Sequence, residues 1–345
     1  MHLILSAPSS EMFLLEELRR GFPHAAHGVR APGLITSNLG LQPEAPPTLA
    51  FARQLLPDVV EHAVPSINAW AMKLMESTAR HLPESQPWLL HVEPFYGTGS
   101  AGRHRCKLIR ESFCELLQQK RRRLLRSLLH EPGPFTLAQS FVQLLLTAPD
   151  RGFVSVAPAP TPNLLRRVMS PFPRGEVPVA SDKEAPSRAF AKLVEAEVRL
   201  GCKIARGETC VDLGASPGSW SYVALQRGAR VLAVDRAPLR ADLMKNRHLK
   251  FVQGDAFTNQ PASAVDWLLC DVIASPERSV GLLIDWVRHR RARRFVLTIK
   301  FKGHEEYAVL EQLKHALPPM CDEFFLTHLC ANKNEVCAFG IVGAV

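Results

Sequence analysis

The chain has 345 residues, of which 46% are hydrophobic and 22% are charged, a composition typical of a folded, soluble protein with two or three domains. No run of about 18 apolar residues occurs, and the first residues lack the basic start and long apolar core of a secretory signal, so we expect a cytoplasmic protein without a membrane span. The eight cysteines form no C-x-x-C pair and no cluster with histidine at zinc-ligand spacing, which argues against a disulfide framework and against a metal site.

The net charge of +9 is unevenly distributed along the chain. Residues 1–100 contain six Lys and Arg against nine Asp and Glu, whereas residues 101–250 contain 26 against 13. A basic middle segment favours an anionic partner, for which a polyphosphate chain such as RNA is the usual candidate. The alternative is that the excess of arginine only keeps the protein soluble.

The first half of the chain predicts a mixture of short strands and helices. Residues 1–65 alternate short apolar strings with Gly, Pro and Asn, which indicates a small α+β subdomain. A helix is expected over residues 66–82 and a strand over 89–97. The segments FTLAQSFVQLLLTAP and GFVSVAPAP are two strands, or a helix followed by a strand.

A single amphipathic helix is predicted over residues 103–129. Its apolar residues recur at helical spacing, and they leave a basic run, Lys120, Arg121, Arg122 and Arg123, outside the apolar stripe. Such a run is either an RNA-contacting surface or a solvated charge cluster near a helix end. We place a domain over residues 66–170 and take residues 171–187, which are rich in proline, as a linker to a domain over 188–345.

From residue 188 onward, strands alternate regularly with helices. Right-handed crossovers between parallel strands place helices on both faces of a sheet, so this pattern predicts a doubly wound, mostly parallel α/β sheet. The last two strands, joined by ANKN, are expected to form an antiparallel hairpin at one edge. This combination is the arrangement of the Rossmann-like, class I methyltransferase fold, here preceded by α+β RNA-binding domains.

The turn after the first of these strands has the sequence D-L-G-A-S-P-G-S-W. Its glycines allow a ligand to approach the backbone closely, and the helix that follows offers free N–H groups. Neither G-x-G-x-x-G nor a P-loop motif occurs, so a dinucleotide or a nucleoside triphosphate is a poorer candidate. The residues expected to contact a cofactor here are Asp212, Gly214, Ser216, Pro217, Gly218, Ser219 and Trp220.

Two further aspartates follow the next two strands. Asp235 is placed to accept hydrogen bonds from the ribose hydroxyls of a nucleoside, and Asp255 to accept one from an adenine amino group. Each of them alone could equally be a turn-forming or helix-capping residue. Carboxylates at successive strand ends together favour a nucleoside-containing ligand.

The D-L-G-A-S-P-G-S-W turn resembles the signature of FtsJ-type ribose 2′-O-methyltransferases, which implies S-adenosylmethionine as the cofactor. The resemblance also implies a Lys-Asp-Lys-Glu tetrad, for which this sequence offers Lys192, Asp271, Lys300 and Glu335. P-S-R-A-F-A-K-L-V-E-A and VDWLLCD extend the likeness to the RlmM type, whose substrate is a cytidine of large-subunit (23S) rRNA or its precursor. That likeness implies a RAGNYA-like and a THUMP-like region in the first half and an RNA contact by Arg188.

The sequence departs from the family pattern in three places. Ser219 replaces a second glycine, TIKFKG replaces a longer string, and NKNE replaces an acidic loop that contains histidine. None of these changes removes a member of the tetrad. They bear more on the identity of the target nucleotide than on the chemistry.

The tetrad residues have distinct expected roles. Lys300 would contact the 2′-oxygen and either accept its proton or stabilise the developing alkoxide, while Lys192 would hold the ribose. Asp271, which also lies at the cofactor, and Glu335 would orient and balance the two ammonium groups. Two alternatives stay open: a non-catalytic RNA-binding scaffold with a methyltransferase-like domain, and a 2′-O-methyltransferase that acts on tRNA or an mRNA cap.

Overall fold

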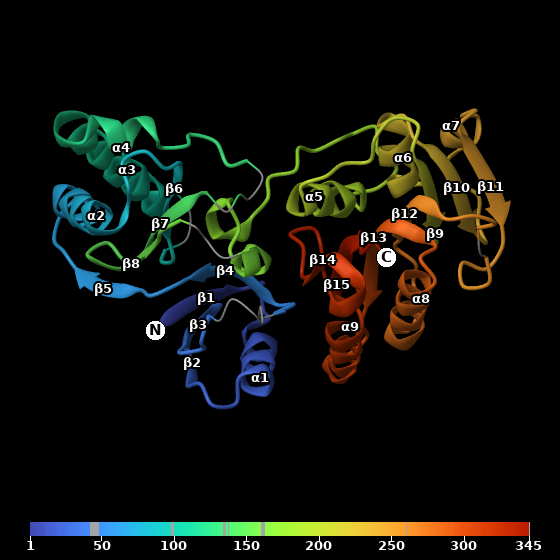
Figure 1. Cartoon of the computed structure of the whole chain (residues 1–345), viewed down its shortest axis with the longest axis horizontal. Helices are drawn as coiled ribbons and strands as arrows, with labels where there is room; N and C mark the ends of the chain where they lie inside the picture. Colours follow the sequence, from blue (N-terminus) through green and yellow to red (C-terminus); the bar gives the residue numbers. More distant parts are fainter. Residues whose placement is uncertain are drawn as a thin grey trace. The chain divides into compact units, whose positions relative to one another are not determined.

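The chain folds into two units, Met1–Glu176 and Val177–Val345, which are described separately and called the N-terminal and C-terminal units (Figure 1). The computed structural model describes residues 1–41, 48–97, 100–133, 136, 138–159, 163–259 and 261–344. The division between the units falls within the proline-rich segment 171–187. Within the described residues, no helix combines the length and the apolar character needed to cross a membrane, and no three His, Cys, Asp or Glu side chains are grouped to hold a metal ion.

The N-terminal unit begins with a four-stranded sheet and one helix. The sheet has the order β2-β3-β1-β4. Helix α1 covers it and buries Leu14, Leu15 and Leu18, so this sheet and α1 form an α+β arrangement. The elements are β1 (His2–Ser6), α1 (Glu11–Gly21), β2 (His27–Ala31), β3 (Leu34–Ser37) and β4 (Ala52–Leu56).

A second four-stranded sheet follows, with the order β5-β8-β7-β6. It consists of β5 (Val60–Ala63), β6 (Trp88–Pro94), β7 (Ser140–Ala148) and β8 (Arg151–Ala157), so both apolar segments after residue 134 contain a strand and pair as an antiparallel hairpin. Because β5 pairs with β8, this sheet starts at Val60, ahead of the predicted division at residue 66.

The two sheets of the N-terminal unit share buried contacts. Leu145 and Phe153 of the second sheet pack in one cluster with Leu3, Leu5 and Leu56 of the first. A buried pair of amides adds to this contact, since Gln54 Nε2 donates to Gln143 Oε1 at 2.7 Å. These contacts explain why residues 1–176 form one compact unit.

The predicted single helix over residues 103–129 is wrong. The structure has α3 (Ala101–Lys120) and α4 (Arg122–Arg126), separated by Arg121, whose φ of −146° is not helical. The chain beyond α4 pairs with the start of β6: Trp88 N donates to Ser127 O, and Leu129 N donates to Trp88 O. These contacts require extended backbone, and they end the helix although the apolar periodicity continues. Helix α2 (Ile67–His81) agrees with its prediction.

The C-terminal unit contains a seven-stranded sheet with the order β11-β10-β9-β12-β13-β15-β14. All neighbouring strands are parallel except β15, which is antiparallel to both β13 and β14, so the predicted doubly wound sheet with an antiparallel edge hairpin is confirmed. The strands are β9 (Thr209–Leu213), β10 (Arg230–Asp235), β11 (Leu249–Gln253), β12 (Val265–Cys270), β13 (Ala292–Lys300), β14 (Cys321–Thr327) and β15 (Glu335–Val342).

Helices cover both faces of this sheet, with α5 and α6 on one side and α8 and α9 on the other (Figure 1). Between β13 and α9 the chain forms the 3-10 helix η3 (His304–Val309). The α-helices are α5 (Phe190–Leu200), α6 (Ser219–Gln226), α7 (Ala241–Met244), α8 (Pro276–Arg288) and α9 (Leu310–Ala316), and the other 3-10 helices of the chain are η1 (Asn163–Arg167), η2 (Pro173–Gly175) and η4 (Pro318–Met320).

Candidate active site

The turn between β9 and α6 needs glycine at two positions. Gly214 has φ of +72°, and a Cβ there would lie 2.7 Å from Val272 Cα. Gly218 has φ of +110°, and a Cβ there would overlap the side chain of Leu243. A residue with a side chain would therefore be strained at both positions and would push the turn away from its neighbours.

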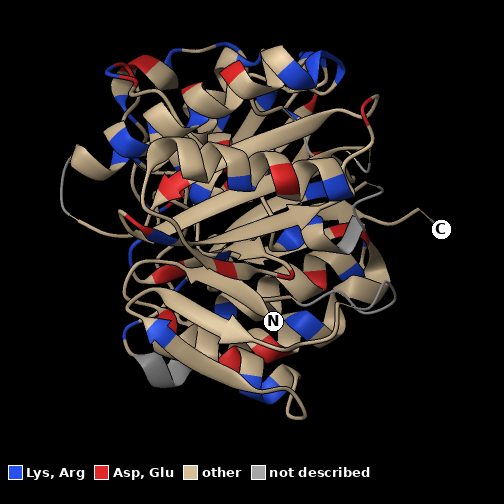
Figure 2. Ribbon diagram, turned by 90° about the vertical axis from the view of Figure 1, so that its left-hand side faces the viewer, with Lys and Arg blue, Asp and Glu red and all other residues tan. Residues whose placement is uncertain are grey.

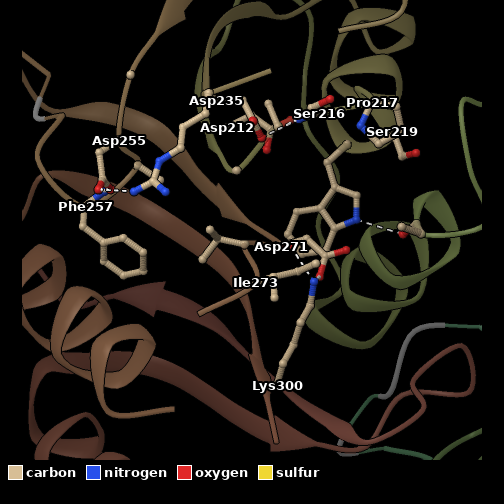
Figure 3. Close-up of a pocket in the computed structure, with 18 of the residues that line it drawn as sticks. Asp212, Ser216, Pro217, Ser219, Asp235, Asp255, Phe257, Asp271, Ile273 and Lys300 are labelled. Atoms are coloured by element: carbon tan, nitrogen blue, oxygen red, sulfur yellow. Dashed lines mark hydrogen bonds and ion pairs between the residues drawn. The ribbon is translucent and has the colours of Figure 1, made fainter. Parts of the chain in front are cut away.

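A pocket of about 450 Å³ lies where the parallel strands β9 to β13 end (Figure 3). This volume is within the range of small-molecule sites, and ligands of open α/β sheets bind at this edge. Every cofactor-binding residue predicted from the sequence lines the pocket except Gly218, which lies in the turn itself. The lining includes Asp212, Gly214, Ser216, Pro217, Ser219, Trp220, Asp235, Asp255, Asp271 and Lys300.

Asp235 and Asp255 both line the pocket and organise its turns. Asp235 accepts from Ser216 N at 2.9 Å, which ties the end of β10 to the glycine turn. Asp255 accepts from Phe257 N at 2.9 Å and from Arg236 at 2.8 Å, and the backbone N–H of Phe257, followed by Arg236, lowers the pKa of Asp255. Both aspartates thus stabilise turns, and both also line the pocket.

Several pocket residues were not predicted from the sequence, among them Arg278, Phe257 and Ile273. The guanidinium of Arg278 lies 3.9 Å from the centre of the Phe257 ring, and the Ile273 side chain is 88% exposed beside Asp271. Phe257 and Ile273 offer apolar surface to a planar ring (Figure 3). Phe257 and Ile273 each lie two residues after a strand-end aspartate, in DAF and DVI, and this spacing is the signal that could have indicated them.

Asp212 is a buried carboxyl at the end of β9, and its exposed fraction is only 1%. Its Oδ2 accepts a hydrogen bond of 2.6 Å from Ser221 Oγ. Burial raises the pKa of Asp212 to about 7, although the hydrogen bonds from Ser221 oppose that rise. The side chain therefore titrates near neutral pH within the pocket wall.

This pKa predicts a pH-dependent effect of Asp212→Asn on stability. Between about pH 4 and pH 7 the folded protein retains a proton that Asp212 of the unfolded chain releases, so stability falls as pH rises through this window. The amide removes that dependence, and the variant should gain about 2 to 3 kcal/mol relative to the parent between pH 5 and pH 8. Urea unfolding of both proteins across this range measures the gain, and a difference that stays constant with pH would contradict the raised pKa.

The structure brings the four predicted tetrad side chains together from four separate elements. Lys192 of α5 lies 2.6 Å from Glu335 Oε1, at the start of β15, and 3.3 Å from Asp271 Oδ1, just after β12. Lys300, the last residue of β13, lies 3.1 Å from Asp271 Oδ1 and donates to Asp271 O at 2.6 Å. Figure 3 shows the Lys300 side chain directed toward Asp271.

The two lysines differ in their surroundings. The Lys192 side chain is 8% exposed; burial lowers its pKa, but the nearby Asp271 and Glu335 outweigh burial and raise it above its ordinary value. Lys192 is therefore held as an ammonium and is unsuited to accept a proton. The Lys300 side chain is 24% exposed and lines the pocket, where a molecule bound in the pocket could contact it.

The tetrad has neighbours that the sequence did not indicate. The buried Thr298 hydroxyl donates to Asp271 Oδ1, and Asn332 Nδ2 donates to Glu335 O at 3.0 Å. The segment before α5 is tied to the glycine turn, since Trp220 Nε1 donates to Ala189 O at 2.8 Å. Partners of this kind fix the orientation of the site residues.

The residues predicted to contact RNA lie outside this pocket. Arg188 is exposed just before α5, whereas Lys120, Arg121, Arg122 and Arg123 are exposed at the junction of α3 and α4. Arg121 lies 3.2 Å from Glu84 Oε1, and Arg122 Nε donates to Gln118 O. Figure 2 shows Lys and Arg interspersed with Asp and Glu on the helices of the N-terminal unit.

Comparison with known proteins identifies the class of the C-terminal unit. Residues 185–312 match the family described as FtsJ-like methyltransferase. The C-terminal unit is thus similar to FtsJ-like methyltransferases over residues 185–312, and its strand order is that of a Rossmann-like fold.

Similar curated proteins have the name Ribosomal RNA large subunit methyltransferase M. The protein from Marinobacter nauticus is 35% identical over 153 residues, which are 42% of this chain and 43% of the relative. A Pseudomonas putida protein is 35% identical over 201 residues, 55% of this chain and 54% of the relative. The chain thus spans about half the length of the curated relatives it matches.

A solved structure with a broad overlap is TrmN from Thermus thermophilus. It covers 99% of both chains at 15% identity, but the TM-score is 0.34, so this likeness supports no argument about function.

Proposed function

We propose that this protein is an S-adenosylmethionine-dependent methyltransferase that methylates a ribose 2′-hydroxyl of RNA, and that its substrate is a cytidine of large-subunit rRNA. The observation that carries the proposal is the position of Lys300, whose ammonium reaches into the pocket beside Asp271. The names of the curated relatives support the choice of large-subunit rRNA as the substrate.

The pocket residues suit the parts of the proposed cofactor. Asp235 would accept from its ribose hydroxyls and Asp255 from its adenine amino group, with Arg236 displaced from Asp255. Phe257 and Ile273 would pack against the purine ring, while the glycine turn would lie along the chain between ribose and sulfur. When bound, S-adenosylmethionine supplies a methyl group on a positively charged sulfur, which an oxygen nucleophile can attack.

The tetrad residues would position the reacting hydroxyl. Lys192 would donate to the ribose, and Asp271 and Glu335 would hold the two ammonium groups that otherwise repel each other. Alignment of the oxygen with the methyl carbon and the sulfur can lower the barrier by about 7 to 11 kcal/mol. Asp271 would also fix the position of the Lys300 side chain at the carboxyl edge of the sheet.

Lys300 would act on the oxygen itself. In methyl transfer an O–C bond would form as the bond from the methyl carbon to the positively charged sulfur breaks and leaves a neutral thioether. The O–H bond also breaks, so negative charge develops on the oxygen while the proton leaves. Lys300 would stabilise that charge as an ammonium or receive the proton as an amine.

Gly214→Ala tests the cofactor site. The added Cβ meets the Val272 backbone at 2.7 Å, and left-handed backbone costs alanine about 1 to 2 kcal/mol, so the turn should move. We expect affinity for S-adenosylhomocysteine to fall at least about tenfold by calorimetry. Gly281→Ala in α8, where the Cβ would meet open space, is the matched control. If the two variants bind S-adenosylhomocysteine with equal affinity, the glycine turn is not part of the cofactor site.

The basic run at the α3–α4 junction is the proposed RNA contact of the N-terminal unit. Neutralising Arg121, Arg122 and Arg123 to Gln should weaken RNA binding and reduce the salt slope, log affinity against log salt, by about 2 to 3. As a charge-matched control, R20Q/R30Q/R80Q removes three arginines that pair with Glu16, Glu61 and Glu76. If both variants have the same salt slope, the basic run is a solvated charge cluster that does not contact RNA.

Transfer of a labelled methyl group to separated RNA classes tests the proposed substrate. Label in large-subunit rRNA, mapped to a cytidine, is the expected result. Label in tRNA or capped mRNA would replace the proposed substrate with one of those RNAs. Binding of cofactor and RNA without any transfer would favour a non-catalytic scaffold.

A further inference from the structure

The sheet edge opposite the pocket carries a row of basic side chains. This edge, here called the amino edge, is where the parallel strands β9, β10, β11 and β13 begin. The residues just before or at the start of these strands are rich in lysine and arginine. Those that are exposed and have no carboxylate of the described residues within ion-pairing distance, here called the row, are Lys203 and Arg206 before β9, Arg230 in β10, Arg247 and Lys250 at β11, and Arg288 and Arg290 before β13.

The acidic groups of these segments are already paired with other residues. Glu208 accepts from Trp267 Nε1 at 2.8 Å and pairs with Arg294 at 3.1 Å. Asp266 accepts from Thr209 N at 2.9 Å and lies 3.4 Å from Arg293. Glu208 is thus occupied by partners that are not exposed, while Asp266 neutralises Arg293, an exposed cation at the start of β13.

The neighbouring carboxylates are occupied in the same way. The buried Glu197 pairs with Arg227 at 3.1 Å, and Asp285 of α8 pairs with Arg291. Across the part of the chain that the structure describes, none of the exposed cations in the row lies within ion-pairing distance of a carboxylate. The amino edge therefore presents positive charge that the fold does not neutralise.

The row is continuous in space, because backbone hydrogen bonds join its segments. Arg230 N donates to Glu208 O, and Val231 N donates to His248 O, which links the starts of β9, β10 and β11. On the other side, Val265 N donates to Arg291 O. Five adjacent strands at about 4.8 Å spacing give a row of roughly 19 Å. It ends toward β14, where Asp322 is exposed.

The row is separate from the candidate active site. The pocket lies at the carboxyl ends of the same strands, and a strand of five or six residues places the two edges roughly 17 to 20 Å apart. A short RNA segment held at Lys300 would not reach the amino edge. A long, folded RNA could contact both edges at once.

We propose that the amino edge is a second RNA-binding surface, which holds the phosphate backbone of a folded RNA at a distance from the nucleotide in the active site. The choice of RNA as the polyanion rests on the proposed function. The positive charge of the surface is an observation that does not depend on that function. Unpaired lysine and arginine side chains in a row of this length match several successive phosphates, and backbone contact of this kind is independent of base sequence.

The test uses the full-length protein with K203Q, K250Q and R288Q combined. The three side chains are exposed and belong to three different segments of the row. Binding of transcribed large-subunit rRNA and of a single-stranded RNA of three nucleotides, which is too short to span the two edges, is measured at several salt concentrations. R20Q/R30Q/R80Q is the charge-matched control, and K203R/K250R/R288K is the rescue variant.

We expect the triple neutralisation to weaken binding of the long RNA roughly tenfold or more and to lower its salt slope by about 2 to 3. The short RNA should bind as before, and the rescue variant should recover the slope. A slope equal to that of the control would overturn the proposal, as would an equal loss for the short RNA. Cofactor-dependent methyl transfer is assayed separately, so a protein that shows these binding effects but transfers no methyl group would refute the proposed function alone.

Discussion

Replacing Lys300 with alanine is expected to reduce the single-turnover rate of methyl transfer by about 100- to 10,000-fold, the range for loss of a proton-transfer or charge-stabilising group. Lys300 is the tetrad ammonium that lines the pocket, whereas Lys192 is enclosed by two carboxylates. Affinity for S-adenosylhomocysteine should change little, because Lys300 contacts Asp271 and not the glycine turn. Rapid quench with labelled cofactor and calorimetry measure the two quantities.

Lys302→Ala is the control for this prediction. Lys302 is exposed two residues beyond Lys300 and does not line the pocket, so its loss removes the same charge from the same segment. Its rate should remain within a few-fold of the parent. A Lys300→Ala protein that turns over as fast as the Lys302→Ala protein would show that Lys300 does not act on the 2′-oxygen.

Replacing Lys192 with methionine is expected to lower both activity and stability. Methionine fills a similar space but leaves Asp271 and Glu335 without the ammonium they share at 3.3 and 2.6 Å. Removing one partner of a buried ion pair commonly costs about 3 to 5 kcal/mol, since a charge is left uncompensated. Urea unfolding measures the loss, and single-turnover assays should show a rate reduced in parallel.

The double variant Lys192→Met with Glu335→Gln separates the two effects. Neutralising Glu335 removes one uncompensated charge, so we expect much of the lost stability to return while the rate stays low. If the double variant is as active as the parent, Lys192 and Glu335 only support the fold. If Lys192→Met alone is fully stable, the charge balance inferred for the tetrad is wrong.

Local patterns account for most of what the sequence predicts about the C-terminal unit. Apolar strands alternate with amphipathic helices, and parallel strands all end at one edge, so the pattern places Asp212, Asp235, Asp255 and Asp271 together there. The glycine turn is equally local, since Gly214 and Gly218 adopt backbone conformations that disfavour other residues.

Features that depend on distant partners were not predicted. The end of α4 at Arg126 follows from backbone pairing of Ser127 and Leu129 with Trp88, more than 30 positions away along the chain. Thr298 lies within an apolar strand. Only the register of β12 against β13 shows that its hydroxyl donates to Asp271. The stacking of Arg278 on Phe257 joins a helix to a loop after β11. Each of these contacts requires coordinates, because none has a periodic signal in the sequence.

The position of the transferred methyl group tests the central claim most directly. Large-subunit rRNA methylated by the protein with labelled cofactor is hydrolysed in alkali and analysed by mass spectrometry. Ribose methylation protects the adjoining phosphodiester, so the account predicts the label in an alkali-resistant dinucleotide with the methyl group on the sugar. Label on a base, in mononucleotides released by alkali, would contradict it.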